Sequence, residues 1–155
     1  MTKQRTLVRA AELAGRDEAF SHPWNPESEV RGQRLGALCG LRRTGVNIVR
    51  LAPGKESFVY HTHTFEEEWI YILSGRGVAE IDGDEHEVGP GDFMGFATPS
   101  VAHHLKNPFD TELVYLVGGE AREFEVADFP KLGKRMIRTG AKIEIYPIDA
   151  AKPFP

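Results

Sequence analysis

Short apolar stretches in which hydrophobic and polar positions alternate run through the middle of the chain, separated by glycine and proline. A period of two is typical of strands with one buried face, and the Gly and Pro positions are typical of turns. Asp82-Gly83, between two such stretches, is a strong hairpin signal. The predicted strands are Val46–Leu51, Ser57–His63, Glu68–Leu73, Gly77–Ile81, Glu85–Val88, Asp92–Phe96, Ala102–Lys106 and Leu113–Val117. Turn signals at intervals of roughly 8–12 residues favour an all-β sandwich or barrel.

The two ends of the chain are less regular than its middle. Val8–Phe20 predicts a short helix, and Leu35–Leu41 predicts a further strand. Ser21–Val30 is too rich in proline for a helix or a central strand. Near the C-terminus, Ile143–Tyr146 alternates as an edge strand does.

The composition is that of an ordinary globular protein. Of 155 residues, 41% are hydrophobic and 27% are charged, which argues against disorder. Lys and Arg number 19 against 23 Asp and Glu, with no basic block, so we expect neither nucleic acid nor a membrane as partner. The single cysteine, Cys39, excludes an intramolecular disulfide and a cysteine-based zinc cluster. Without a signal-peptide pattern or an apolar run of about 18 residues, we expect a soluble, cytoplasmic protein.

Four of the six histidines lie in two places, as the pair His61 and His63 and the pair His103 and His104. Residues i and i+2 of a strand point to the same face, so His61 and His63 project together. Neighbouring imidazoles are costly to bury unless something satisfies them, and a neutral ring nitrogen is a good ligand for Zn, Cu, Fe or Ni. The pattern therefore makes these histidines candidate metal ligands.

A run of three acidic residues, Glu66-Glu67-Glu68, follows the first histidine pair. Glu68 is in phase with Ile70 and Ile72, so it can point inward as the strand begins. A bound cation would relieve the repulsion within the run. We expect Glu66 and Glu67 to form a solvated acidic turn, with Glu67 also able to support a ligand histidine.

Two stretches of the chain resemble the two motifs of the cupin family. Gly54–Gly75 reads G-x6-H-x-H-x4-E-x6-G, which is similar to the first motif with one extra residue before the histidines. Gly91–Asn107 is similar to the second motif, although Thr98-Pro99-Ser100 stands where Pro-x-Gly is expected. The resemblance implies a cupin-type double-stranded β-helix, or jelly-roll barrel, with short irregular or helical terminal extensions. The implied division is an N-terminal extension (1–34), a barrel core (35–119) and a C-terminal extension (120–155) packed on the barrel.

The resemblance also implies a ligand set. Carried over to this sequence, one divalent transition metal ion (Fe, Mn, Zn, Ni or Cu) is bound by His61, His63, Glu68 and His103. His104 is the rival of His103, because adjacent strand residues face opposite ways and only one of them can point into the barrel. The motif spacing to Asn107 favours His103.

Two function classes remain open at this point. The first is a metal-dependent enzyme acting on a small molecule, of the dioxygenase, decarboxylase or isomerase type, since similar cupins include all three. The second is a non-catalytic cupin that binds a sugar or another small molecule. The complete ligand set argues against a third class, a structural protein with a degenerate site. No side chain stands out in the sequence as the catalytic acid or base.

The apolar pattern also bears on assembly. If Glu68, Ile70 and Ile72 point inward, then Trp69 and Tyr71 lie on the outer face of the same predicted strand. The predicted strand Leu113–Val117 is apolar on both faces. Either the chain's own termini or a second copy must cover these surfaces. We predict a homodimer with Trp69 or Tyr71 near the contact. His22, in the irregular N-terminal segment, is expected at the surface, with closure of the barrel mouth as the alternative.

Overall fold

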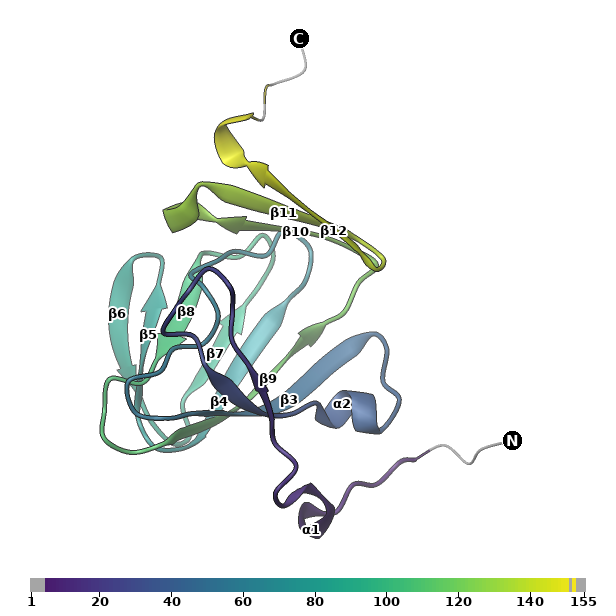
Figure 1. The fold of residues 1–155 in the computed structure, drawn as a ribbon, viewed down its shortest axis with the longest axis vertical. Coiled ribbons are helices and arrows are strands. Elements are labelled where there is room, and N and C mark those ends of the chain that lie inside the picture. Colours follow the sequence, from purple (N-terminus) through teal and green to yellow (C-terminus); the bar gives the residue numbers. More distant parts are fainter. Residues whose placement is uncertain (1–4, 151, 153–155) are drawn as a thin grey trace.

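Three antiparallel sheets make up most of the computed structural model, which describes residues 5–150 and 152 (Figure 1). The largest sheet has the order β1-β2-β3-β9-β4-β7, and the other two have the orders β6-β5-β8 and β10-β11-β12. The elements are α1 (Ala10–Leu13), β1 (Glu18–Phe20), β2 (Val30–Gln33), α2 (Leu35–Leu38), β3 (Thr44–Leu51), β4 (Glu68–Ser74), β5 (Gly77–Ile81), β6 (Asp84–Val88), β7 (Phe93–Phe96), β8 (His103–Lys106), β9 (Leu113–Glu120), β10 (Phe124–Phe129), β11 (Lys134–Thr139) and β12 (Lys142–Pro147), with 3₁₀ turns at Pro130–Leu132 and Ile148–Ala150.

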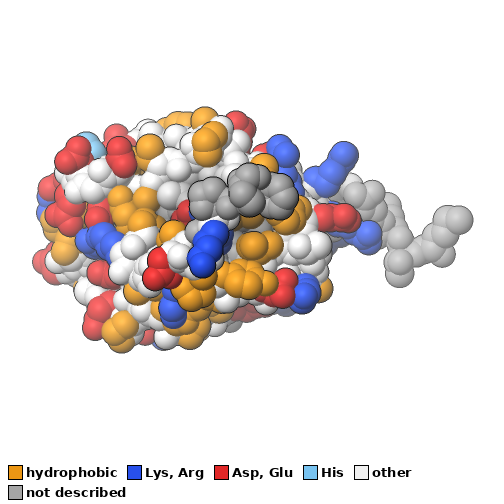
Figure 2. Space-filling model, turned by 90° about the horizontal axis from the view of Figure 1, so that it is seen from above, with side chains coloured by type: hydrophobic (Ala, Val, Ile, Leu, Met, Phe, Trp, Pro, Cys, Tyr) orange, Lys and Arg blue, Asp and Glu red, His pale blue; other side chains and the backbone are white. Residues whose placement is uncertain are grey.

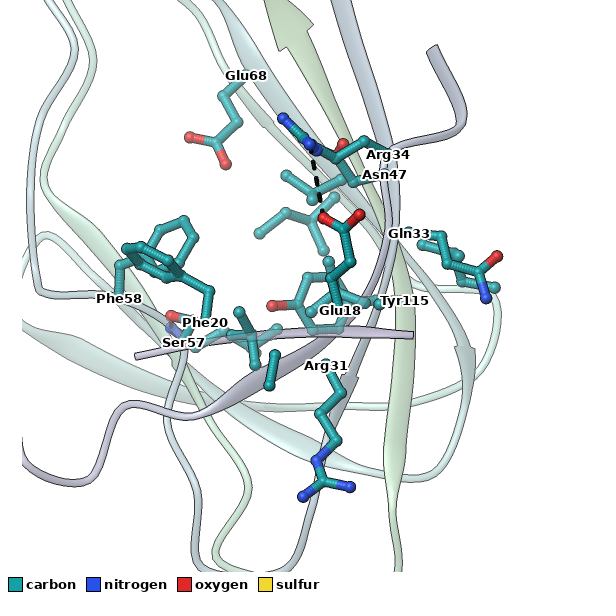
Figure 3. A pocket seen from close by; sticks show the side chains of 18 of the residues that line it. Glu18, Phe20, Arg31, Gln33, Arg34, Asn47, Ser57, Phe58, Glu68 and Tyr115 are labelled. Carbon is teal, nitrogen blue, oxygen red and sulfur yellow. Dashed lines mark hydrogen bonds and ion pairs between the residues drawn. The ribbon is translucent and has the colours of Figure 1, made fainter. Parts of the chain in front are cut away.

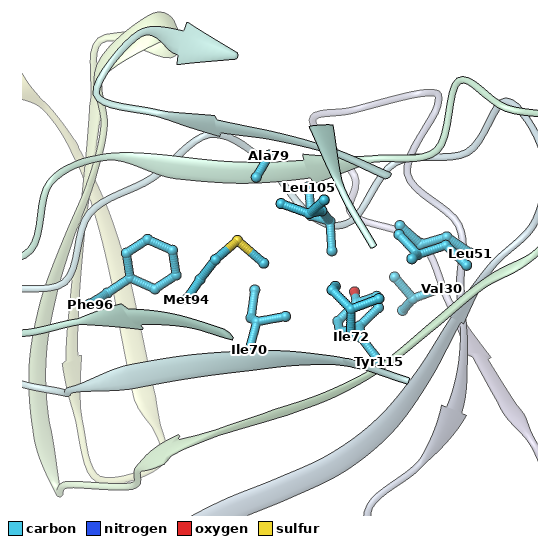
Figure 4. Packing of buried hydrophobic residues seen from close by; sticks show 11 residues of the cluster. Val30, Leu51, Ile70, Ile72, Ala79, Met94, Phe96, Leu105 and Tyr115 are labelled. Carbon is cyan, nitrogen blue, oxygen red and sulfur yellow. The ribbon is translucent and has the colours of Figure 1, made fainter. Parts of the chain in front are cut away.

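The first two sheets face each other and enclose the main core (Figure 4). Ile70 and Ile72 of β4 point inward, as their alternation predicts, and Ile72 is fully buried. Ala79 and Leu105 meet them from the opposite sheet. Burying one such aliphatic side chain stabilises a fold by about 1.5–3 kcal/mol. The core residues are Val30, Leu51, Ile70, Ile72, Ala79, Val88, Met94, Phe96, Leu105, Leu113 and Tyr115.

The predicted hairpin at Asp82-Gly83 is confirmed. Asp82 and Gly83 both have positive φ, +51° and +88°, and they join β5 to β6. A two-residue turn with positive φ at both positions has the twist that antiparallel strands require, and glycine adopts that conformation without strain.

Two predictions at the N-terminal end need correction: the first helix is shorter than its predicted segment, and a predicted strand begins as a helix. The helix expected over Val8–Phe20 is limited to Ala10–Leu13, and the strand β1 follows it. The segment Leu35–Leu41 begins as the helix α2 and not as a strand. Short apolar runs do not distinguish the two structures by themselves. The glycine at position 36 lets α2 lie close to β3, because a Cβ there would lie 3.2 Å from the carbonyl oxygen of Thr44.

The segment Ser57–His63 is not a regular strand, contrary to prediction. It lies between β8 and the C-terminal sheet and divides its backbone hydrogen bonds between them. The Ser57 amide donates to the Leu105 carbonyl (2.8 Å), and the Thr62 amide donates to the Asp128 carbonyl (2.9 Å). A single antiparallel bridge pairs His61 with His103.

The sheet β10-β11-β12 packs on this histidine-bearing segment and closes one end of the barrel (Figure 1). β12 confirms the edge strand predicted near Ile143–Tyr146, whereas β10 and β11 were not anticipated. A second apolar cluster joins this sheet to the segment below it. Its members are Val59, Ala127 and Phe129, with Trp24 and Met136 packed against them.

The surface of the molecule at the end closed by the sheet β10-β11-β12 carries charges of both signs. Figure 2 shows Lys and Arg interspersed with Asp and Glu on this face, with hydrophobic side chains between them. None of the helices in the described part of the chain has the length and apolar character needed to cross a membrane.

Candidate metal centre

Neighbouring strands bring together the four side chains that the sequence analysis singled out. The antiparallel bridge between His61 and His103 places these two residues side by side, with their amides and carbonyls bonded at 2.9 and 3.2 Å. Glu68 is the first residue of β4 and pairs with β7 on one side and β9 on the other. His63 follows His61 by two residues and reaches the same point. Its amide donates to the hydroxyl of Ser100 at 2.8 Å.

The ligand-type atoms of the four side chains converge on one point. His63 Nε2 lies 3.0 Å from His61 Nε2 and 3.0 Å from Glu68 Oε2. His103 Nε2 lies 3.2 Å from the same carboxylate oxygen. One nitrogen or oxygen from each of the four side chains lies within 4.8 Å of all the others. With metal–ligand bonds of about 2.1 Å, ligand atoms at right angles are roughly 3 Å apart, so these separations suit a single ion.

The other ring nitrogens show which atoms face the centre. The Nδ1 atoms of His61 and His103 lie 2.7 and 3.1 Å from the carbonyl oxygens of Val59 and Val101. A carbonyl oxygen can only accept a hydrogen bond, so each Nδ1 must carry the hydrogen. Each Nε2 then presents a lone pair to the centre. Lone pairs and a carboxylate oxygen crowded at these distances repel each other unless a cation lies between them. The donor set therefore fits a divalent metal ion.

The electrostatics of the cluster agree with this chemistry. Burial lowers the pKa of His61 to about 4, so its imidazole is neutral at pH 7. Burial opposes ionisation of Glu68, but its close contacts with the rings of His103 and His63 outweigh burial and hold the pKa of that carboxyl well below its usual range. For His63, burial favours the neutral ring, yet the bond to Glu68 and the nearby acidic charges raise its pKa. The centre thus attracts positive charge, in the form of a proton or of a metal ion.

A buried carboxylate from the C-terminal sheet lies behind His63. Glu125 of β10 is fully buried, and its Oε1 accepts the amide hydrogens of Thr64 (2.8 Å) and Phe65 (3.2 Å). The same oxygen lies 4.0 Å from His63 Nδ1, a buried atom with no hydrogen-bond partner among the described residues. Sequence reasoning missed Glu125, since it lies outside both motifs and no local signal marks it.

Glu66 is buried and does not form part of a solvated turn, contrary to prediction. Its Oε1 accepts the amide hydrogen of Arg122 at 2.6 Å and pairs with the guanidinium of Arg138. Glu67 is exposed, as expected. Glu125, and not Glu67, is therefore the carboxylate nearest the far side of His63. His63, Glu66 and Glu125 also lie close enough to hold an ion, but both carboxylates are already bonded to backbone amides.

His104 faces away from the cluster. In the β5–β8 register His103 pairs with Ile81 and His104 pairs with Glu80, so the two imidazoles point to opposite sides of the sheet. His104 Nε2 lies 3.7 Å from Glu56 Oε2 and is not one of the four converging ligand-type atoms. The structure thus brings His103, and not His104, to the other three side chains.

A cavity of about 360 Å³ adjoins the cluster, with His61, Glu68 and His103 in its wall (Figure 3). Strand β1 lies at its mouth, where Glu18 and Phe20 line it. His22 does not line the cavity; it is half-buried against Trp24. Most of the wall is apolar. Its hydrophobic members are Ala19, Phe20, Val30, Ile48, Val49, Phe58, Ile70, Leu105 and Val117.

Comparisons with known proteins agree with this geometry. The family model described as Cupin domain matches residues 47–119. A solved structure from Acidithiobacillus ferrooxidans, provisionally named a sugar phosphate isomerase, is 33% identical with a TM-score of 0.93 and covers 96% of both chains. A sugar phosphate isomerase of the cupin superfamily from Silicibacter pomeroyi is 26% identical with a TM-score of 0.78 and covers 89% of both chains.

A relative of curated description is the tetracenomycin polyketide synthase protein TcmJ of Streptomyces glaucescens. It is 26% identical over 106 residues, which are 67% of each chain. Three observations agree on the family. They are the two-layered β-barrel, the match to the Cupin domain model and the 96% overlap with a solved structure of 33% identity. The chain belongs to the cupin family.

Proposed function

We propose that this chain is a metal-dependent enzyme acting on a small oxygen-bearing molecule, with isomerisation of a hydroxy-carbonyl compound as its reaction class. The observation that carries the proposal is the convergence of three Nε2 atoms and Glu68 Oε2 in the wall of a cavity of about 360 Å³. The names of the relatives that are 33% and 26% identical support isomerisation over the other reactions of cupins.

The proposed ligands are His61, His63, Glu68 and His103, for one divalent transition metal ion. Three imidazoles and one carboxylate leave positions free for substrate oxygens on a six-coordinate ion. When bound, the ion supplies Lewis-acid polarisation of a carbonyl group, which acidifies the adjacent C–H bond.

The chain's own residues prepare the site. The carbonyls of Val59 and Val101 fix the orientation of two imidazoles, so that each Nε2 is ready to donate its lone pair. Glu125 holds the backbone at Thr64 and Phe65 and places a negative charge behind His63. The apolar walls exclude water, which strengthens every electrostatic interaction with the substrate.

The test has two stages. Metal content is measured first, in freshly purified protein and after supplementation; we expect about one ion per chain, and loss of binding in Glu68→Ala. Solvent exchange is measured next, by NMR in D₂O, as deuterium uptake at the carbon beside the carbonyl in a panel of hydroxy-ketones and hydroxy-aldehydes. This readout detects proton transfer whatever the final product.

Three results would contradict the proposal. Less than about a tenth of an equivalent of metal after supplementation would exclude the site. Oxygen consumption without deuterium uptake would favour a dioxygenase. Binding of the panel compounds by metal-loaded protein, with neither exchange nor turnover, would favour the non-catalytic binding cupin.

A further inference from the structure

We infer that the molecule bound in this cavity has an apolar body next to its metal-binding oxygens, and that the Tyr115 hydroxyl donates a hydrogen bond to one of those oxygens. The inference rests on the proposed metal-dependent function and specifies the substrate class of the same site. It departs from the sugar phosphates in the names of the relatives.

The apolar part of the argument comes from the cavity wall. Phe20 of β1 and Phe58 meet edge to face, with ring centroids 5.2 Å apart, at the mouth beside the cluster (Figure 3). They remain 52% and 43% exposed, so a bound molecule could cover much of their surface. A sugar placed against these two rings would lose hydration from the hydroxyls that face them, and the rings offer those hydroxyls no hydrogen-bond partner. The same surfaces favour an aliphatic or aromatic group.

The charges of the lining residues argue against a phosphate group. Arg34 lines the cavity, but its guanidinium is paired with the carboxylate of Glu18 at 3.5 Å. Arg31 is paired with Glu29 at 3.3 Å, and in Figure 3 its side chain points away from the cavity. The described lining residues include no lysine. Since Glu68 adds a second negative charge to the wall, a dianion would find no unpaired Lys or Arg among the described lining residues, and only a metal ion in the cluster would attract it.

Tyr115 supplies a polar contact that no described residue of the protein uses. It lies on β9, is only 3% exposed, and its hydroxyl oxygen faces the cavity (Figure 3). No hydrogen bond joins that hydroxyl to any described residue, although buried hydroxyls ordinarily have a partner. A tyrosine phenol ordinarily titrates at about pH 10, so at neutral pH this hydroxyl has a proton to donate. It therefore acts as a donor, and an oxygen of the bound molecule is its acceptor.

Two 2-hydroxy acids test the inference with the same chelating end. Mandelate carries a phenyl group, and 3-phosphoglycerate carries a phosphorylated hydroxymethyl group. Their dissociation constants are measured by isothermal titration calorimetry on protein loaded with one equivalent of Zn²⁺ or Mn²⁺. We expect mandelate to bind at least tenfold more tightly than 3-phosphoglycerate. Tighter binding of 3-phosphoglycerate, or no binding of either acid to metal-loaded protein, would overturn the inference.

Tyr115→Phe tests the hydrogen bond. One neutral hydrogen bond contributes about 0.5–1.5 kcal/mol, so mandelate affinity should fall about two- to tenfold while metal content stays at one equivalent. Tyr71→Phe, on the exposed outer face of β4, is the matched control and should bind mandelate as the wild type does. Equal affinity in Tyr115→Phe and wild type would refute the role of the hydroxyl.

Phe58→Ala tests the apolar contact. It should weaken mandelate at least threefold more than lactate, which has the same chelating end and only a methyl group. A structural role for Phe58 would weaken both acids equally and would contradict this part of the inference. Failure of the proposed function is recognised separately, because it appears as protein that retains no metal before any acid is added.

Discussion

His104 is a buried, neutral imidazole, and we predict that its protonation destabilises the fold at acid pH. The residue is 8% exposed, and its Nε2 has no hydrogen-bond partner among the described residues. Burial lowers the pKa of His104 to about 4; the nearby Lys106 and Lys131 act in the same direction, and Glu56 and Glu80 oppose them without restoring the ordinary value.

The sign and size of the effect follow from proton linkage. An unfolded chain binds the proton at about pH 6.5, whereas the folded chain binds it only near pH 4. Between these values the unfolded state holds more protons, so the free energy of unfolding decreases as the pH falls. The contribution of neutral His104 to the free energy of unfolding is therefore complete above about pH 6.5 and is lost by about pH 4. At about 1.4 kcal/mol per pKa unit, the total loss is about 3 kcal/mol, and most of it is lost by about pH 4.5.

The assay is urea unfolding of wild type and His104→Gln, both treated with a chelator, at several pH values between 7.5 and about 4.5. The cluster residues are the same in both proteins, so the difference between the two curves isolates His104. We expect wild type to lose about 2–3 kcal/mol more than the variant across this range. His86→Gln, at an exposed position of β6, should follow the wild-type curve. Parallel curves for wild type and His104→Gln would refute the reasoning.

Three further predictions concern the cluster and the assembly. His103→Ala should abolish metal binding, whereas His104→Ala should weaken it at most slightly, as measured by metal content; the reverse order would contradict the register of β8. Metal occupancy should fall below about pH 6, because imidazole ligands must be neutral to bind, and occupancy unchanged down to pH 4 would argue against histidine ligands. Tyr71 and Phe93, which are 39% and 63% exposed on neighbouring strands, make the outer face of β4 and β7 the expected homodimer contact. Light scattering at micromolar concentration should then give about twice the chain mass of 17.3 kDa, and a monomer would contradict the dimer.

The barrel and the cluster were accessible from the sequence because their signals are local. Alternation placed Ile70 and Ile72 in the core, and Asp82-Gly83 marked the β5–β6 hairpin. The i, i+2 spacing of His61 and His63 also predicted that their imidazoles meet, even though the segment is not a regular strand.

Other features depended on partners distant in the chain. The sequence does not distinguish helix from strand at Leu35–Leu38, because its packing against β3 decides between them. Glu66 belongs to an acidic run that looks solvated, and only the approach of Arg138 from β11 shows that it is buried and paired.

By itself, the sequence determined which residues alternate and where the chain turns, since both follow from spacing along the backbone, whereas the full set of candidate metal ligands came from the resemblance to the cupin motifs. Only the tertiary structure decided that Glu125 lies behind His63, that Phe20 lines the cavity mouth, and that the Tyr115 hydroxyl faces the cavity with no partner in the described part of the chain. The physical reason is that burial and hydrogen bonding at these positions depend on strands far apart in the chain. No local periodicity records which distant strand will supply a neighbour.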